Sequence, residues 1–362
     1  MKKLFSLFIV ASMVLSAFPL IAATGIGTGV GVDINTEDFP PIAWMCGERV
    51  VYDDNTEPGR YIRTGELVER INNYAFEGES IEWNVLVMDK NGKEKIEDVF
   101  ATIGDVQGEG NDIEVNCVRS DKTGIEESCN ARILEEEISW NKDVMAYYDC
   151  TLTIETPESM YGEYWITVEA VDMDGLSSTI DENEYWFLNP EIAISIDGEL
   201  AFSDVRPGTQ SYSDTLLVGN DADQGSGVMM DMFISGTDFY DSSSSGAMCP
   251  DTNQLSLDNF RYYATNGAYS TVGDDVNDVV DGDRNKDVEG YMNIDYGIGF
   301  NNPSPFYNNM EILQDQRVDG TYYAANLLAP GAEMALTFKL SLPEPCNGDF
   351  DTGQIFFWGE AI

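Results

Sequence analysis

The stretch YWITVEAV (residues 164–171), followed by DMDG (residues 172–175), decides how the chain is expected to fold. It is rich in β-branched and aromatic residues, and it ends in a turn signal with Asp and Gly. A buried strand that closes on a tight turn is therefore predicted here. Its length of eight residues is ordinary for a strand and short for a helix.

The same signature recurs outward from this stretch in both directions. Further strands followed by turns are expected before it, at residues 81–88, 112–118, 131–138 and 146–154. Near the end of the chain, one face of a predicted strand holds Met334, Leu336, Phe338, Leu340 and Leu342, and the other holds Ala335, Thr337, Lys339 and Ser341. A last strand is expected at residues 354–362. Short strands without a helical period of 3.6 predict an all-β fold built from sandwiches.

Two resemblances refine this prediction. GEYWITVEAVDMDG (residues 162–175) is similar to the closing strand and turn of Ig-like and PKD-type surface domains, and FEGESI (residues 76–81) resembles an earlier strand entry there. The order of strands and Pro-Gly turns over residues 193–362 resembles that of TasA-like (camelysin-like) fibre proteins, which are secreted jelly-roll sandwiches. A long polar excursion, residues 241–309, departs from that pattern.

Together these features predict two sandwich domains in an arrangement that resembles archaeal surface proteins. Residues 41–190 are expected to form an Ig-like β-sandwich, and residues 191–362 a TasA-like, jelly-roll-like β-sandwich. A signal peptide (residues 1–23) and a Gly-rich strand or linker (residues 24–40) are expected to precede them.

The first residues are typical of a Sec-type signal peptide. Lys2 and Lys3 form a basic start, residues 4–21 are largely apolar, and Ala22 and Ala23 offer small residues for cleavage. A retained membrane anchor is the alternative, since the apolar stretch is long enough to span a bilayer. The prediction is an extracellular, surface-located protein without a membrane span once the signal is removed.

Charge and composition limit the possible functions. The 362 residues include 65 acidic and 19 basic side chains, for a formal net charge of −46, and no histidine. Such a charge repels nucleic acid and anionic lipid. The lack of histidine excludes Ser-His-Asp, Cys-His and His-zinc chemistry, although a pair of carboxylates could still hydrolyse glycosides. No enzyme activity is expected, with a carboxylate hydrolase as the least favoured alternative.

Six cysteines fit an oxidising compartment. Cys249 and Cys346 are the two in the second half, so a disulfide between them is predicted. The other four, Cys46, Cys117, Cys129 and Cys150, allow three pairings among which the sequence does not choose.

Calcium is the only cofactor that the sequence suggests. Oxygen ligands suited to a hard cation recur in one loop at Asp281, Asp283, Asn285, Asp287 and Glu289. The EF-hand glycine is absent, because Lys286 occupies its position, and a solvated acidic loop is the alternative. A second, weaker candidate combines Asp172 and Asp174 with Asp181 and Glu182.

The N-terminal segment suggests how the protein could work. Glycines alternate with larger side chains there, and the larger side chains are Ile26, Thr28, Val30, Val32 and Ile34. This segment could complete the sheet of a neighbouring copy by donor-strand exchange, or it could pair as an edge strand within its own chain.

The function predicted is a structural subunit of a surface layer, fibre or pilus-like assembly, whose partners are further copies or other surface proteins. The alternative is an adhesin that binds glycans through aromatic side chains such as Tyr262, Tyr263 and Tyr269, or Tyr307, Tyr322 and Tyr323.

Overall fold

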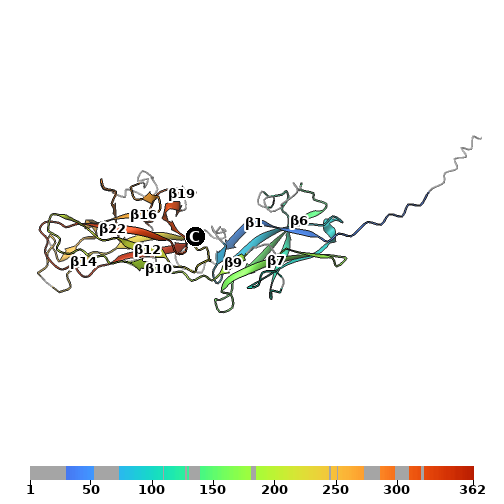
Figure 1. Cartoon of the computed structure of the whole chain (residues 1–362), viewed down its shortest axis with the longest axis horizontal. Coiled ribbons are helices and arrows are strands. Elements are labelled where there is room, and N and C mark those ends of the chain that lie inside the picture. Colours follow the sequence, from blue (N-terminus) through green and yellow to red (C-terminus); the bar gives the residue numbers. More distant parts are fainter. Residues whose placement is uncertain are drawn as a thin grey trace, which may run out of the picture. The chain divides into compact units, whose positions relative to one another are not determined.

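The computed structural model describes most of the chain after residue 29 (Figure 1). The described residues are 30–52, 73–108, 110–126, 129, 139–180, 185–243, 246–250, 252–272, 286–297, 310–318 and 322–362. The chain divides into two units, residues 1–38 and residues 39–362. In the first unit, residues 30–38 are described and lack regular secondary structure.

The second unit is built almost wholly from strands, as the sequence predicts. The described residues of the first half form nine strands: β1 (Ile42–Tyr52), β2 (Tyr74–Ala75), β3 (Ser80–Met88), β4 (Ile96–Gly104), β5 (Ile113–Ser120), β6 (Met145–Thr153), β7 (Gly162–Asp172), β8 (Ser177–Ile180) and β9 (Tyr185–Leu188). The second half contains β10 (Ile194–Asp197), β11 (Gln210–Tyr212), β12 (Leu216–Asn220), β13 (Met230–Gly236), β14 (Phe239–Tyr240), β15 (Gln254–Leu255), β16 (Phe260–Asn266), β17 (Tyr269–Ser270), β18 (Met292–Asn293), β19 (Arg317–Val318), β20 (Tyr322–Tyr323), β21 (Leu327–Leu328), β22 (Glu333–Ser341) and β23 (Ile355–Ala361). Three short 3₁₀ turns accompany them, η1 (Lys93–Lys95), η2 (Leu257–Asn259) and η3 (Ala324–Asn326).

The first half is a β-sandwich. One layer holds β1, β3 and β6, and the other holds β4, β7 and β9, with β8 added beside β7. The short strand β2 runs parallel to β9, whereas the other pairs are antiparallel. The buried faces of the two layers enclose a core that includes Trp83 and Trp186, each at most 2% exposed.

Strand β5 links the two layers of this sandwich. Its first half, Ile113 to Asn116, pairs with β4, and its second half, Cys117 to Ser120, pairs with β6. Cys117 lies directly opposite Cys150 of β6, and the two form a disulfide. The second bridge of this half joins Cys46 to Cys129. Of the three pairings that the sequence allows, the structure therefore has the one that joins Cys46 to Cys129 and Cys117 to Cys150.

The second half is another two-layer sandwich. Its larger sheet has the order β10-β12-β22-β16-β17, with β11 beside β22 and β18 beside β16. The facing sheet has the order β21-β13-β23, and residues 310–312 add to it beside β13 through a bridge between Glu311 and Phe233. The bridge between Cys249 and Cys346 that the sequence predicts is present in this half.

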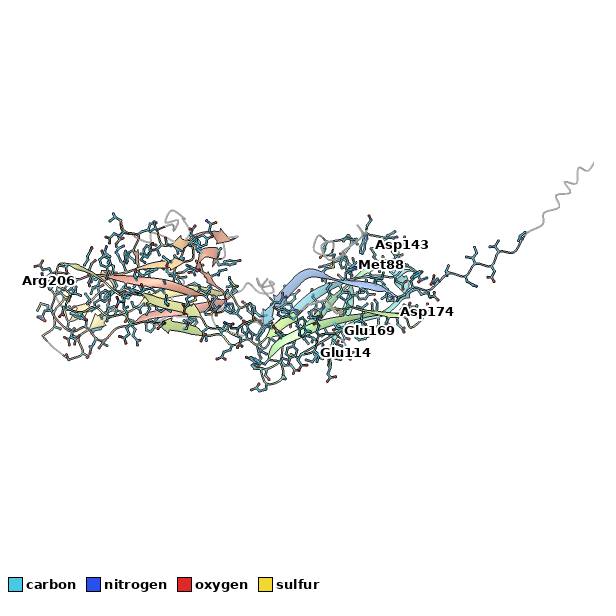
Figure 2. All side chains as sticks on the ribbon, in the orientation of Figure 1. Met88, Glu114, Asp143, Glu169, Asp174 and Arg206 are labelled. Carbon is cyan, nitrogen blue, oxygen red and sulfur yellow. A yellow bond between two sulfur atoms is a disulfide. The ribbon has the colours of Figure 1, made fainter. Side chains whose placement is uncertain are left out.

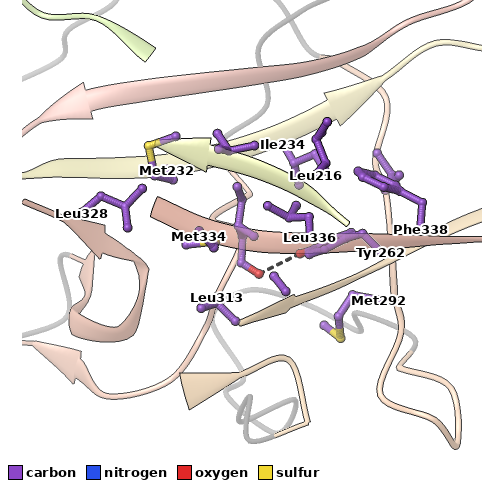
Figure 3. Close-up of a cluster of buried hydrophobic side chains, with 14 of the residues drawn as sticks. Leu216, Met232, Ile234, Tyr262, Met292, Leu313, Leu328, Met334, Leu336 and Phe338 are labelled. Carbon is purple, nitrogen blue, oxygen red and sulfur yellow. Dashed lines mark hydrogen bonds between the residues drawn. The ribbon is translucent and has the colours of Figure 1, made fainter. Parts of the chain in front are cut away.

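The core of the second sandwich follows from the alternation in β22. Met334, Leu336, Phe338 and Leu340 are at most 4% exposed and belong to one buried cluster. Figure 3 shows Met334, Leu336 and Phe338 in this cluster. Burying each such side chain stabilises the fold by roughly 1.5–3 kcal/mol. Tyr262 of β16 is fully buried among them, and its hydroxyl donates a 2.8 Å hydrogen bond to the backbone oxygen of Ile312.

Within the described residues, no helix has the length and apolar character needed to cross a membrane. Of the predicted strands, residues 131–138 lie outside the described part of the chain.

Removing the bridge between Cys249 and Cys346 by serine substitution is expected to lower the free energy of unfolding of the second sandwich by about 2–5 kcal/mol. The bridge closes a loop with a sequence separation of 97 residues, against 33 for Cys117 and Cys150. Because the entropy removed from the unfolded chain grows with loop length, the shorter bridge is expected to contribute about 1 kcal/mol less. Denaturant titration of the two double variants checks both values. A larger loss for the shorter loop would contradict the loop-entropy explanation.

Candidate functional site

The described part of the N-terminal segment presents apolar side chains to solvent. Val30 is 87% exposed, Val32 75% and Ile34 77%. All three belong to the alternating set that the sequence singles out as an assembly strand. The other two, Ile26 and Thr28, lie outside the described residues.

The predicted calcium loop is described only at its end. Asp281, Asp283 and Asn285 lie outside the described residues, whereas Asp287 and Glu289 are placed. Both carboxylates bind one ammonium group: Nζ of Lys339 lies 2.8 Å from Oδ2 of Asp287 and 2.6 Å from Oε2 of Glu289. In this structure the two predicted metal ligands therefore serve as the ion-pair partners of a lysine.

Two aromatic rings and two backbone amides complete the surroundings of Lys339. The rings of Tyr212 and Tyr291 lie 5.8 Å and 5.5 Å from Nζ, a distance suited to cation–π attraction. The Tyr212 hydroxyl donates to Oε2 of Glu289 at 2.9 Å. Oδ1 of Asp287 accepts the N–H groups of Glu289 and Tyr291 at 2.9 Å and 3.0 Å. The two carboxylates and the two rings favour the charged form of the ammonium, whereas the backbone amides and the Tyr212 hydroxyl favour the charged form of the carboxylates.

The turn that carries these carboxylates depends on a glycine. Gly290 has a φ of +89°, in the left-handed region, and its N–H donates to the backbone oxygen of Asp287. A Cβ atom added there would lie 2.6 Å from Cγ2 of Val272. A larger residue at this position would therefore strain the turn that brings Asp287 and Glu289 to Lys339.

The charges in this cluster stabilise one another. Although burial alone would lower it, the hydrogen bonds and charges of Asp287 and Glu289 raise the pKa of Lys339 to about 12. Burial alone would raise the pKa of Asp287, but the Lys339 ammonium and the two backbone amides bring it below its usual range. The hydrogen bond from Lys339, followed by that from Tyr212, lowers the pKa of Glu289.

The sequence missed this cluster because it placed Lys339 on the solvent side of its strand. The alternation in β22 does direct Lys339 away from the core, yet its side chain is only 5% exposed. Residues 287–291, distant in sequence, cover it. The acids nearest to Lys339 in the sequence, Glu333 and Glu344, are not its partners, so the local sequence does not reveal Asp287 and Glu289.

A second buried polar group lies in the sheet β21-β13-β23. Asp231 is 5% exposed, and its Oδ1 accepts a 2.6 Å hydrogen bond from Nδ2 of Asn326, which is fully buried. Burial raises the pKa of Asp231 to about 6, opposed by hydrogen bonds with Asn326 and Glu311 and reinforced by the charge of Glu360.

Two of the six tyrosines considered from the sequence as a glycan-binding surface are buried, whereas Tyr263 and Tyr322 are half-buried. Tyr262 is a core residue, and Tyr323 is 3% exposed. Tyr269 remains 39% exposed, and Tyr307 lies outside the described residues. Two of the six tyrosines thus fill the interior, because alternate positions of these strands face the core.

Among the residues that the structure describes, no three acidic or cysteine side chains converge closely enough to hold a metal ion as they stand. Calcium binding therefore remains a prediction.

Replacing Lys339 with methionine is expected to lower the free energy of unfolding by about 2–3 kcal/mol near neutral pH, because Asp287 would keep its charge without its partner. The matched control is Lys142→Met, which removes the same charge from an exposed position.

The loss caused by Lys339→Met should shrink as the pH falls. Asp287 and Glu289 have lowered pKa values in the folded chain, so their contribution is present above the usual carboxyl range and is lost on acidification. Denaturant titrations at neutral and acidic pH measure this. A difference between variant and wild type that does not change with pH would show that the lysine acts through packing alone.

Asp231→Asn is expected to stabilise the protein above pH 6 and to have little effect near pH 4. The folded-state pKa of about 6 lies above the ordinary value of 3.8, so this carboxyl makes the wild type less stable as the pH rises from about 4 to 6. An increase of about two units in the pKa of Asp231 lowers the free energy of unfolding by roughly 3 kcal/mol at most above pH 6. Asp197→Asn, at an exposed position, is the control. Parallel stability curves for wild type and Asp231→Asn across this range would contradict the expectation.

Comparison with known proteins does not assign the chain to a family. No family model matches the chain, and no curated protein matches it. Among solved structures, the chain was matched to the serine-rich repeat protein Srr2 of Streptococcus agalactiae at 10% identity, over 80% of this chain and 88% of that one. The TM-score of 0.15 is too low for that match to support an inference about fold or function.

Proposed function

We propose that the chain is a non-enzymatic structural protein of the cell surface, a subunit of a layer, fibre or pilus-like assembly. The observation that carries this proposal is the exposure of Val30, Val32 and Ile34 at alternate positions. In an extended chain these side chains share one face, as a strand requires when it joins the sheet of another molecule. Exposed apolar side chains in such a row are otherwise a liability for a secreted protein.

The all-β fold with three disulfides supports a location outside the cytoplasm. The acidic composition supports an exposed, well-solvated surface and no role with nucleic acid. The absence of histidine from the sequence supports a role that does not depend on acid–base catalysis by that residue.

Serine substitution at Val30, Val32 and Ile34 together is expected to abolish self-association of the chain that begins at Thr24. The control replaces Asp33 and Asn35, which alternate with them, by serine. If the apolar face joins a neighbouring subunit, light scattering should show large species for the wild type and the control, and monomers for the triple variant.

A wild type that stays monomeric in every condition would contradict the assembly proposal. The alternative would then be a surface adhesin or carbohydrate-binding protein. Binding to a glycan array by the monomer would support that alternative, for which Tyr240 and Tyr296, 40% and 43% exposed, offer accessible rings.

A further inference from the structure

The second sandwich holds an amine against a carboxyl group. Nζ of Lys339 lies 2.8 Å from Oδ2 of Asp287, and the two side chains are only 5% and 18% exposed. The rings of Tyr212 and Tyr291 lie on the ammonium and limit its contact with water. Two reacting groups held in this way can react as if one of them were present at about 10⁵–10⁸ M.

The other oxygen of Asp287 lies between two backbone donors. Oδ1 accepts the N–H of Glu289 at 2.9 Å and the N–H of Tyr291 at 3.0 Å. When an amine adds to Cγ of Asp287, negative charge develops on this oxygen. Fixed N–H donors at such distances stabilise the oxyanion in acyl transfer. The turn at Gly290 thus supplies an oxyanion site as well as an ion pair.

Glu289 lies where a proton carrier for such a reaction is needed. Its Oε2 is 2.6 Å from Nζ of Lys339, within reach of direct proton transfer. The Tyr212 hydroxyl donates to the same oxygen at 2.9 Å and so orients the carboxylate. A nucleophile, a base in contact with it, a group that orients the base and an oxyanion site therefore occur together.

We propose that Lys339 and Asp287 join in an intramolecular amide bond, with Glu289 as the catalytic proton carrier. Glu289 takes one proton from the ammonium, and the neutral amine attacks Cγ of Asp287. A bond forms between Nζ and Cγ, a second proton leaves the nitrogen through Glu289, and the bond from Cγ to Oδ2 breaks. Oδ2 departs as water with both protons, and Glu289 ends as a carboxylate. No further reactant is consumed.

Burial favours the product over the ion pair. The two charged groups have lost most of the water that would solvate them, whereas an amide is neutral. The oxygen that would become the amide carbonyl already accepts two backbone N–H groups. Because its carboxylate partners raise the pKa of Lys339 to about 12, neutral amine is scarce and the reaction is slow. One turnover in the lifetime of each chain is nevertheless enough.

The bond would hold the second sandwich together where no disulfide does. It would join residues 52 apart in the sequence and fasten the turn that carries Asp287 to β22. An amide, unlike a disulfide, also survives reducing conditions. The reaction does not depend on assembly, because all its groups belong to one chain. The pH dependence expected for Lys339→Met applies to chains in which the pair is still ionic, since neither side chain titrates once they are joined.

The test is the mass of the chain that begins at Thr24, incubated in its folded state at mildly alkaline pH and then reduced and unfolded. The wild type is expected to be about 18 Da lighter than its sequence mass, through the loss of one water. Digestion should yield a branched peptide in which Asp287 is joined to Lys339. On a reducing, denaturing gel the wild type should migrate faster than Lys339→Met, because the cross-link keeps the unfolded chain more compact.

Three variants and a control define the mechanism. Lys339→Met should keep its full mass. Glu289→Gln should fold, since this side chain is 46% exposed, but should lose water about 10²–10⁴-fold more slowly. Tyr212→Phe should slow the reaction without abolishing it and without lowering the unfolding temperature, as expected of a positioning residue. The control is Glu114→Gln at an exposed position of β5 (Figure 2), which should react like the wild type.

Three results would overturn the proposal. A wild type that keeps its full mass after prolonged incubation has formed no amide. A loss of water that persists in Lys339→Met comes from another reaction, such as succinimide formation at an Asp-Gly pair. A Glu289→Gln variant that reacts at the wild-type rate contradicts the role of Glu289. The first result is obtained on the wild type alone, so it does not depend on whether any variant folds.

Discussion

Acidic side chains outnumber basic ones by more than three to one in this chain, and the placement of the few buried charges is the constraint on which the structure depends. A buried carboxylate needs a compensating group, and the supply of lysine and arginine is small. Asp287 uses Lys339 and two backbone amides. Asp231 uses the amide of Asn326 and takes up a proton more readily than an exposed carboxyl does.

The arrangements around Asp287 and Asp231 share one geometric feature. In each, a charged side chain lies outside the apolar space between two sheets, and a segment from a distant part of the chain covers it. Lys339 projects from the outer side of β22 and is covered by residues 287–291, and Asp231 projects from β13 and is covered by residues 310–314 and 326. Polar contacts hold these covering segments in place.

The sequence predicted those parts of the structure that depend on alternation. The strands around residues 81–88, 164–171 and 334–342 form as expected, and the apolar face of the third is buried in the core. The sequence did not predict which residues that are remote in sequence contact each other. The partner of Lys339 and the pairing of Cys46 with Cys129 both depend on how the sheets stack, which no local pattern records.

The disulfides also set how the molecule responds to a mechanical load. The bridges from Cys46 to Cys129 and from Cys249 to Cys346 together span about half of the 362 residues. An unfolded chain extends by roughly 3.4 Å per residue, but residues enclosed by a covalent loop cannot contribute to that extension. Pulled between its two ends, the oxidised protein can therefore extend to only about half of the length of the reduced chain, and reduction of the bridges would release the enclosed residues.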